Sequence, residues 1–421
     1  MIQELFEKAL NVNAPWYVKE LNFDPNSKRL DIYVDFRRGS TFNYYDKDNS
    51  VELVGLKAYD TTTKRWRHLN FFEHECYIEA RVPRVKLPNG KVKIIKTPWE
   101  GLSNGFTLLF EALIVQLSMS MPINQVSKLI GVHNDKLWSM LDKYIRGVRK
   151  REDFSNIDSI GIDETSRAKG HEYITLFVDL NKRRTLFVTD GKSSKTIKDF
   201  TKDLKEHNGN KESIKQVSCD MSPAFIKGVN ENMPNANITF DKFHVIKLIN
   251  EAVDRVRRDE LKSNKLLKGT KYIWLKNEVN LTIKQKELLE QLTISKMNIK
   301  TIRAYNIKKS YQDIYEAKDK KEFITYLNKW YYWATHSRLE PIKSVAYTIK
   351  RHWSGIVNWF ETKINNGILE GLNSVIQAAK AKARGYKTFK NYKIIVYLLT
   401  GKFDFSIVNK NIRKSYNGVT H

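Results

Sequence analysis

The sequence predicts an α/β fold for the middle of the chain, and two observations lead to this prediction. Short apolar runs with strand character alternate there with helix-like segments, and several of the runs end directly on an aspartate. The predicted order is strand, strand, strand, helix, strand, helix, strand, helix. The strands cover 157–163, 173–179, 184–188, 214–219 and 237–240, and the helices cover 193–206 and the segments after Ser222 and Asp241.

This order of elements is that of an RNase H-like sheet. Polar groups that act on ligands gather at the carboxyl ends of strands in such sheets, so neighbouring strands would bring Asp163 and Asp220 together. Two like charges so close are costly unless a divalent cation joins them, and oxygen ligands suit Mg²⁺ or Mn²⁺ rather than zinc. A strand-end aspartate can also simply form a turn. That explanation serves for either residue alone, but the two in this order favour a metal site.

Composition points to a polyanion as partner. The 421 residues leave room for two to four domains, and the formal net charge is +26. Nucleic acid is the simplest explanation, although ribosomal or membrane-surface binding could give the same balance. The two cysteines, Cys76 and Cys219, exclude a disulfide framework and fit a reducing cytoplasm. We expect no signal peptide, and the apolar run 394–399 is too short to span a bilayer.

Residues 1–100 are predicted to form a small β-rich module. Apolar residues alternate with polar ones over 30–36 and 76–82, as in strands with one buried face. Asn89-Gly90 predicts a hairpin with a type I′ turn. Basic and aromatic residues interleave over 64–68, which suits phosphate contact and base stacking, or equally a solvated basic edge strand.

Residues 101–152 predict a helix-turn-helix and a basic linker. The first helix covers 121–130, Gly131 supplies the turn, and Asn134 can cap the second helix. Apolar residues of the two helices would face inward, and they are Ile123, Val126, Leu129, Ile130, Leu137, Met140 and Leu141. Polar residues would face a DNA major groove or its backbone, and they are Asp135, Lys136, Ser139, Lys143 and Arg146.

Residues 251–355 predict an all-α insertion in the sheet domain, because the pattern there becomes helical and strongly basic. It holds an aromatic cluster over 330–333, followed by Trp353, Trp359 and Phe360. These side chains are most simply core residues of helix pairs, although a role in holding an unstacked base is open.

A third acid comes at the start of a helix predicted over 367–384. Leu369, Leu372, Ile376, Ala379 and Ala383 recur at helical spacing as a buried stripe. One position later a polar row follows the same spacing, and it consists of Glu370, Asn373, Gln377, Lys380 and Arg384. The acid at the start of the row, Glu370, suits metal binding, and the two cations at its end, Lys380 and Arg384, suit contact with the DNA backbone. An ordinary polar helix face is the alternative.

Several separate stretches, taken in order, resemble DDE insertion-sequence transposases of the ISL-three family. They are 161–164, 219–222, 240–245, 337–342, 367–374 and 380–386. The resemblance implies that Asp163, Asp220 and Glu370 form the catalytic triad and hold two Mg²⁺ or Mn²⁺ ions per site. It also implies an enzyme that binds the terminal inverted repeats of its element and cleaves and transfers strands by two-metal phosphoryl transfer.

The resemblance also bears on the organisation of the chain. Residues 153–250 and 356–412 would be the two parts of the RNase H-like domain, with 413–421 as a tail. Family members usually carry paired zinc-binding cysteines near the N-terminus, but the corresponding stretches, 42–46 and 85–90, contain none. Zinc is therefore not expected, and the module should keep its shape by packing.

Two further residues stand beside the expected site. Asp241 could replace Asp220 as the second metal ligand, or could fix His244 by a hydrogen bond. His244 would orient a neighbour or contact DNA, with Asn373 close by, whereas Glu164 would point to the other face of its strand.

The expected partners are double-stranded DNA, both element ends and target, and further copies of the chain, since pairing two ends needs at least a dimer. We expect a bacterial protein of the cytoplasm, associated with the nucleoid, and no membrane partner. The alternatives are another RNase H-fold nuclease or resolvase, a DNA-binding regulator with an inactive catalytic domain, and a purely structural basic protein, which would leave the acids unexplained.

Overall fold

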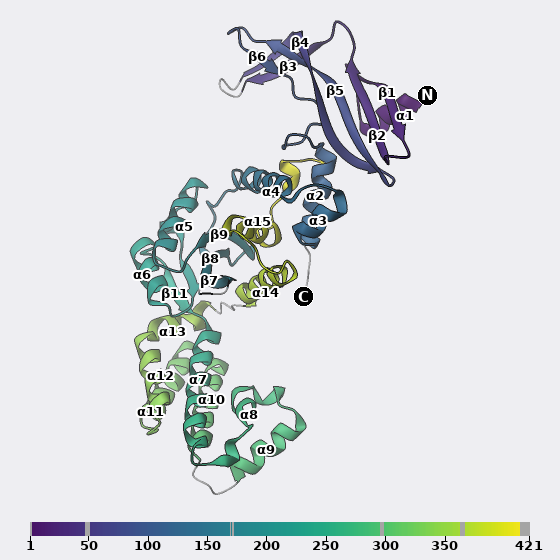
Figure 1. Cartoon of the computed structure of the whole chain (residues 1–421). Coiled ribbons are helices and arrows are strands. Elements are labelled where there is room, and N and C mark those ends of the chain that lie inside the picture. The colour runs from purple at the N-terminus through teal and green to yellow at the C-terminus, as the bar shows by residue number, and fades with distance from the viewer. Residues whose placement is uncertain are drawn as a thin grey trace. The chain divides into compact units, whose positions relative to one another are not determined.

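The computed structural model describes residues 2–46, 51–168, 170, 172–294, 299–362 and 367–412, so the expected tail, 413–421, lies outside it. The chain divides into two compact units (Figure 1). One consists of residues 1–152 and the segment that begins at Ala378, and the other of Asp153–Gln377. The segment expected to complete the catalytic domain, 356–412, is therefore shared between the two units.

The N-terminal module of the first unit is a six-stranded sheet with one short helix. The sheet order is β1-β2-β5-β4-β3, and β6 pairs with β5. The elements are α1 (Ile2–Leu10), β1 (Trp16–Asp24), β2 (Arg29–Phe36), β3 (Thr41–Asp46), β4 (Val51–Phe71), β5 (His74–Lys86) and β6 (Val92–Ile94). The two predicted alternations are confirmed, because Leu30, Ile32, Cys76 and Ile78 all lie in the buried core.

The Asn89-Gly90 turn exists, but it is not of type I′. The Gly90 amide donates to the Leu87 carbonyl oxygen at 2.9 Å, and the Leu87 amide donates to the Lys91 carbonyl oxygen at 2.8 Å. Gly90 has a φ of +79°, whereas Asn89 is not among the residues with positive φ. A type I′ turn needs positive φ at both central residues. The hairpin instead uses a tight turn that ends on a left-handed glycine.

The basic and aromatic run at 64–68 is not available for base stacking, and it is only partly the solvated edge strand of the alternative interpretation. Over these residues β4 pairs with β5 on one side, whereas β3 pairs only with residues 51–57 of β4. On the other side Arg67 forms a single bridge, to Phe106. Trp66, Arg67 and His68 are buried at 1%, 5% and 8% exposure, so they are not available for stacking on a base. Lys64 pairs with Glu100 at 3.0 Å. These side chains stabilise the module itself.

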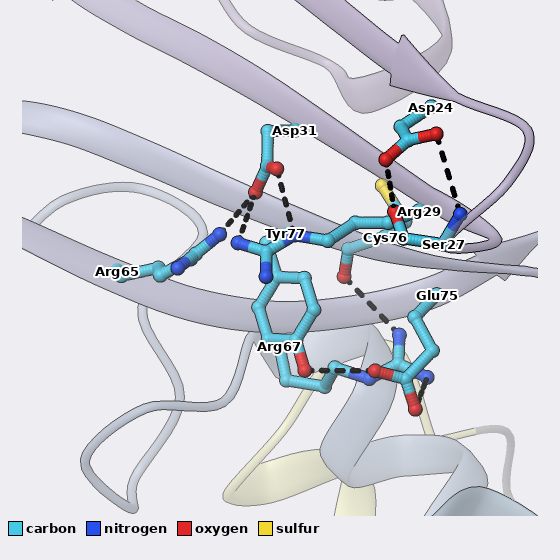
Figure 2. A network of polar contacts seen from close by, with 9 residues as sticks. All are labelled: Asp24, Ser27, Arg29, Asp31, Arg65, Arg67, Glu75, Cys76 and Tyr77. Atoms are coloured by element: carbon cyan, nitrogen blue, oxygen red, sulfur yellow. Dashed lines mark hydrogen bonds and ion pairs between the residues drawn. The ribbon is translucent and has the colours of Figure 1, made fainter.

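The arginines of this module form an internal polar network (Figure 2). Asp31 accepts hydrogen bonds from Arg29 and Arg65. The guanidinium groups of Arg29 and Arg65 also lie over the ring of Tyr77, at 4.8 and 4.6 Å from its centroid. Arg67 donates to the Cys76 carbonyl oxygen at 3.1 Å. Charge pairing and cation–π contacts thus hold this face of the sheet together.

The predicted helix-turn-helix is confirmed. Helix α2 (Leu108–Ser120) precedes α3 (Ile123–Ile130) and α4 (Asn134–Arg149), and Gly131 between α3 and α4 is left-handed at φ +68°. Two details of the prediction are wrong. Leu129 is 64% exposed rather than buried, because it lies off the face that α3 turns inward. His133, not Asn134, caps α4, since its side chain accepts from the Asp135 amide.

The C-terminal helix α15 (Phe389–Thr400) belongs to the same unit as the helix-turn-helix. The Asn409 side chain, shortly after α15, donates to the Tyr144 hydroxyl of α4 and to the Leu108 carbonyl oxygen of α2, both at 2.7 Å. Tyr144 in turn donates to the buried carboxylate of Glu111 at 2.8 Å. This chain of hydrogen bonds joins three segments that are far apart in sequence.

The second unit is built on a five-stranded mixed sheet of order β11-β10-β7-β8-β9. Strands β7 (Ser159–Ala168), β8 (Glu172–Asp179) and β9 (Arg184–Asp190) are antiparallel to one another, and β10 (Gln216–Cys219) and β11 (Asn237–Phe240) run parallel to β7. The strand that contains Asp163, β7, and the strand that precedes Asp220, β10, are therefore neighbours, as predicted. Between the strands come α5 (Lys195–Glu206) and α6 (Pro223–Asn232).

The two faces of this sheet are covered by different helices. Ile160, Ile162 and Phe177 belong to the large core that includes residues of α5 and α6. Because side chains alternate along a strand, the residues between them face the other way. On that side Val178 packs against Leu369 of α14 (Gly367–Lys382). The sheet thus lies between α5 and α6 on one face and α14 on the other.

The region predicted as an all-α insertion, 251–355, is helical, and its helices extend beyond these bounds on both sides (Figure 1). Its elements are α7 (Lys242–Leu261), α8 (Lys271–Leu275), α9 (Ile283–Ile294), α10 (Lys300–Asp313), α11 (Lys320–Thr335), α12 (Glu340–Arg351) and α13 (Trp353–Thr362). Trp330 is a core residue at 1% exposure, as expected, but Tyr332 and Trp333 are exposed at 67% and 42%. None of the described helices is long and apolar enough to cross a membrane.

We predict that Tyr144→Phe lowers the free energy of unfolding of the first unit by about 1–2 kcal/mol, because it leaves the buried Glu111 carboxylate one donor short. Differential scanning calorimetry of the full chain measures the loss. Tyr392→Phe is the matched control, since the Tyr392 hydroxyl is buried and has no hydrogen-bond partner among the described residues. Its removal should leave stability unchanged or slightly higher. Equal losses of unfolding free energy in the two variants would contradict the stabilising role of the Tyr144–Glu111 hydrogen bond.

Candidate active site

Three aspartates lie at the same edge of the sheet because of strand register. On parallel strands β7 and β10, Gly161 pairs with Ser218, so Asp163 and Asp220 each follow a paired position by two residues. On β10 and β11, Cys219 pairs with Phe240, so Asp220 and Asp241 are the next positions of neighbouring strands. Adjacent strands are roughly 4.8 Å apart. The register therefore aligns Asp163 with the carboxyl ends of β10 and β11. The prediction that the first strand ends at Asp163 is wrong, because β7 continues to Ala168 and stays paired with β8.

Helix α14 lies along β7 with matched spacing. A Cβ on Gly161 would come within 2.9 Å of Leu369, so the absent side chain allows the close approach of the helix. Four residues later, Asn373 donates a hydrogen bond to Asp163. After four more, Gln377 donates to the Thr165 hydroxyl at 2.5 Å and to the Ser166 carbonyl oxygen at 3.2 Å. Four helical residues rise about 6.0 Å and two strand residues about 6.6 Å. Every fourth residue of α14 can therefore contact every second residue of β7.

This packing brings Glu370 to the aspartates. Glu370, Asp163 and Asp241 line one pocket of about 450 Å³, together with His244 and Asn373. Asp220 is not among the residues that line it. The carboxylate of Asp220 accepts from the Ser222 amide at 3.0 Å, at the start of α6. The pocket therefore combines the first and third predicted acids with Asp241, while register keeps Asp220 at the neighbouring strand end.

The buried carboxyl groups lie close enough to affect one another's pKa. Burial raises the pKa of Asp163 to about 6, and the charges of Asp220 and Asp241 add to this effect, against the Glu164 amide and His244, which oppose it. Burial also raises the pKa of Glu370, and the charge of Asp241 contributes. A group that resists ionisation beside other carboxylates gains from a bound cation.

Asp241 and His244 form a pair at the start of α7. Asp241 caps the helix by accepting from the Phe243 amide at 2.9 Å, and its other oxygen lies 3.2 Å from His244 Nδ1. The neighbouring Asp241 carboxylate raises the pKa of His244 against the opposing effect of burial. The two side chains are close enough for an ion pair, but His244 Nδ1 has no hydrogen-bond partner among the described residues, so the hydrogen bond between them stays a prediction. Asp241 also lines the pocket, so the alternative that it serves as a ligand stays open.

The donor set suits a hard divalent cation, although the carboxylates are not gathered into a preformed cage. In the described part of the chain, no group of three or more His, Cys, Asp or Glu side chains is arranged to hold a metal ion. The pocket nevertheless offers carboxylate oxygens from Asp163 and Glu370. Asn373 Oδ1 is buried there without a partner among the described residues. An unsatisfied buried oxygen beside carboxylates fits Mg²⁺ or Mn²⁺.

Some of the residues expected to contact DNA are exposed, whereas others are bonded within the protein or lie outside the predicted helix. Lys136, Ser139, Lys143 and Arg146 are exposed on α4, as the prediction requires. Gln377 does not fit, because its amide nitrogen is bonded to β7 and serves to anchor α14. The helix ends at Lys382, two residues earlier than predicted, and Arg384 has a left-handed φ of +57°. Arg384 therefore follows the helix instead of continuing the row that includes Lys380.

Three residues of the pocket were missed by the sequence analysis. Phe243, Lys247 and Ser374 line it beside the acids. Phe243 and Lys247 follow Asp241 at positions that share one face of α7, and Ser374 follows Asn373. Helical spacing counted from His244 could have identified Lys247, which comes three residues later.

Comparison with known proteins places the chain in a family. A family described as "Transposase" matches residues 160–396, more than half of the chain, and the "Helix-turn-helix domain of transposase family ISL3" matches residues 103–145. The transposase for insertion sequence element IS1001 of Bordetella parapertussis is 28% identical over 370 residues, which cover 83% of this chain and 89% of that protein. The transposase for insertion sequence element IS1557 of Mycobacterium tuberculosis (strain CDC 1551 / Oshkosh) is 26% identical over 354 residues, 77% and 79% of the two chains.

These matches cover the helix-turn-helix and the sheet with its carboxylate edge, in the order in which they occur along the chain. The resemblance noted in the sequence is thereby confirmed. The chain belongs to the ISL3 family of DDE insertion-sequence transposases.

Proposed function

We propose that the second unit is an RNase H-like catalytic domain that cleaves DNA at the ends of an insertion sequence and joins those ends to target DNA. The observation that carries the proposal is the convergence of Asp163 and Glu370 in one pocket through the packing of α14 on β7. The strand order supports it, since three antiparallel strands followed by two parallel ones form the RNase H-like arrangement.

Asp163, Asp220 and Glu370 would hold two divalent cations, Mg²⁺ or Mn²⁺. When bound, such cations activate a water or a DNA 3′-hydroxyl as nucleophile and stabilise the leaving oxygen. Asn373 fixes the Asp163 carboxylate by its hydrogen bond, and Asp241 orients His244 beside the pocket. We keep Asp220 as the second ligand because its strand neighbours that of Asp163, with Asp241 as the alternative.

The helix-turn-helix would read the terminal inverted repeats, with Lys136, Ser139, Lys143 and Arg146 facing the DNA. Lys380 and Arg384 would contact the DNA backbone. Since two ends must be paired before joining, the active form would be at least a dimer on DNA. We place it in the bacterial cytoplasm, on the nucleoid. A nuclease of the same fold would share the acids, but a helix-turn-helix followed by a large insertion favours the transposase.

We predict that Asp163→Asn reduces cleavage of element-end DNA at least about a thousandfold, because the amide cannot replace an anionic ligand, while binding to the same DNA stays unchanged. Gel-based cleavage and mobility-shift assays measure the two effects. Glu231→Gln, at an exposed acid on α6, is the matched control and should cleave normally. Comparing Asp220→Asn with Asp241→Asn assigns the second ligand: the assignment changes if only the Asp241 variant is inactive.

The raised pKa of Asp163 predicts a pH dependence of metal binding. Below about pH 6 this carboxyl group is protonated in the folded protein, so a cation must displace a proton. The affinity for Mn²⁺ should therefore fall as pH decreases below about 6, by up to about tenfold per pH unit, and level off above it. Calorimetric Mn²⁺ titrations between pH 5 and 8 measure this dependence. Equal affinity at pH 5 and pH 7 would refute the prediction.

The exposed face of α4 predicts how DNA binding depends on salt. Replacing Lys136 by Ala removes one cation near DNA, so affinity should drop and the slope of log K against log salt should decrease by about one. Fluorescence anisotropy with end DNA at several salt concentrations measures both. Lys227→Ala on α6 is the control, and an identical response of the two variants would contradict a DNA-facing α4.

A further inference from the structure

A second and larger cavity lies beside the catalytic pocket, within the helical insertion. Its volume is about 660 Å³, which falls in the range of small-molecule sites, about 300–1,000 Å³. The N-terminal turn of α7 forms one wall, and α10 and α13 form others. Asp241 and Phe243 line both this cavity and the catalytic pocket, so the two share a wall.

Phe243 stands at this shared wall with an exposed side chain. Its relative exposure is 52%, unusual for a phenylalanine with a large core nearby. Three further aromatic residues, Tyr305, Tyr315 and Trp359, also line the cavity. Every nucleobase presents a π face that can stack on an aromatic ring. The cavity therefore offers one accessible stacking surface next to the carboxylates, with aromatic walls beyond it.

The charges in the cavity favour a neutral guest. Lys309 is paired with Glu278 at 2.7 Å. The ammonium of Lys242 lies 4.2 Å from the ring centroid of Tyr315 and 5.7 Å from that of Trp359, so cation–π contacts fix it to the wall. Lys276 also lines the cavity, with its ammonium 5.9 Å from the ring centroid of Tyr272. Asp313 and Glu316 add negative charge to the lining. Carboxylates repel a phosphate, but they accept hydrogen bonds from the amino groups of bases.

Side-chain amides complete the set of hydrogen-bonding groups. Gln312 and Asn277 line the cavity, and the Gln312 side chain donates to Asn277 at 2.8 Å. The remaining amide hydrogen and carbonyl oxygen of this pair can bond to the edge of a base. Aromatic, amide and carboxylate groups around one cavity match the needs of a nucleobase better than those of a free anion or a lipid.

We propose that this cavity receives one nucleobase, extruded from the DNA duplex beside the phosphate to be cleaved, and that Phe243 stacks on it. The inference rests on the proposed function, because it places the neighbouring nucleotide at the acids. Extrusion turns the DNA backbone toward the catalytic pocket and fixes the position of the scissile phosphate. Phe243 thereby acts as a positioning residue for cleavage.

Extrusion is measured with end-DNA duplexes that carry 2-aminopurine at each position near the cleavage point in turn. The Asp163→Asn protein is used so that the DNA stays intact. A base that leaves the stack becomes more fluorescent, and we expect a severalfold rise at one position on protein binding. Adding Phe243→Ala should abolish this rise. Tyr347→Ala is the matched control, because Tyr347 is 53% exposed in the same insertion but does not line the cavity.

Cleavage gives an independent measurement. With Asp163 intact, Phe243→Ala should slow cleavage of the normal duplex about ten- to a hundredfold, the usual effect of losing one base–aromatic stack. Phe243→Trp should cleave nearly normally. On a duplex that lacks the base at the extruded position, wild type and Phe243→Ala should cleave at the same rate, because no base remains to be stacked.

Two outcomes would overturn the inference alone: unchanged fluorescence at every position, or equal cleavage of the normal duplex by wild type and Phe243→Ala. Gln312→Ala, on another wall of the cavity, should show the same base-dependent defect. Normal cleavage by this variant would show that the Gln312 amide does not bind the base. Failure of the wild-type protein to cleave any end duplex would instead refute the proposed function, and the inference with it.

Discussion

The close contact between Leu369 and Gly161 determines the geometry of the catalytic unit. Leu369 fills a small apolar pocket with Val178 and Leu180, and only a residue without a side chain at position 161 lets α14 approach β7 this closely. Once this contact is made, helical and strand spacing carry Asn373 to Asp163 and Gln377 to Thr165. Glu370, next to Leu369, is thereby held at the pocket. An apolar contact thus positions the polar groups that would do the chemistry.

The same packing explains why the acids are coupled. Asp163 projects from the face of the sheet that α14 covers, so its carboxyl group is buried, and burial is the main cause of its raised pKa. Strand register adds the charges of Asp220 and Asp241 at the same edge. A site of this kind is costly without a counter-charge. This cost is the physical reason to assign it to divalent cations.

The first unit is stabilised differently, by charged side chains that bond to one another within the unit. Asp31, Arg29 and Arg65 bond to one another around Tyr77, and Glu111, Tyr144 and Asn409 join the helix-turn-helix to the C-terminal segment (Figure 2 shows the first network). A strongly basic composition therefore overstates the cations available to DNA. Arg67 of β4 is buried and Arg65, although exposed, is bonded to Asp31, whereas the lysines of α4 are exposed.

The sequence by itself determined the features that depend on neighbours along the chain. Hydrophobic periodicity located the strand that contains Asp163, the strands that precede Asp220 and Asp241, the helix-turn-helix around Gly131 and the helix that begins near Glu370. Tertiary structure decided the features that depend on partners far away in the chain. It buried Trp66 and Arg67 of β4, bonded Gln377 to β7, and placed Asp241 in the pocket with Phe243 beside it. Local pattern fixes which face of an element is apolar, but the element against which that face packs is chosen by long-range contacts.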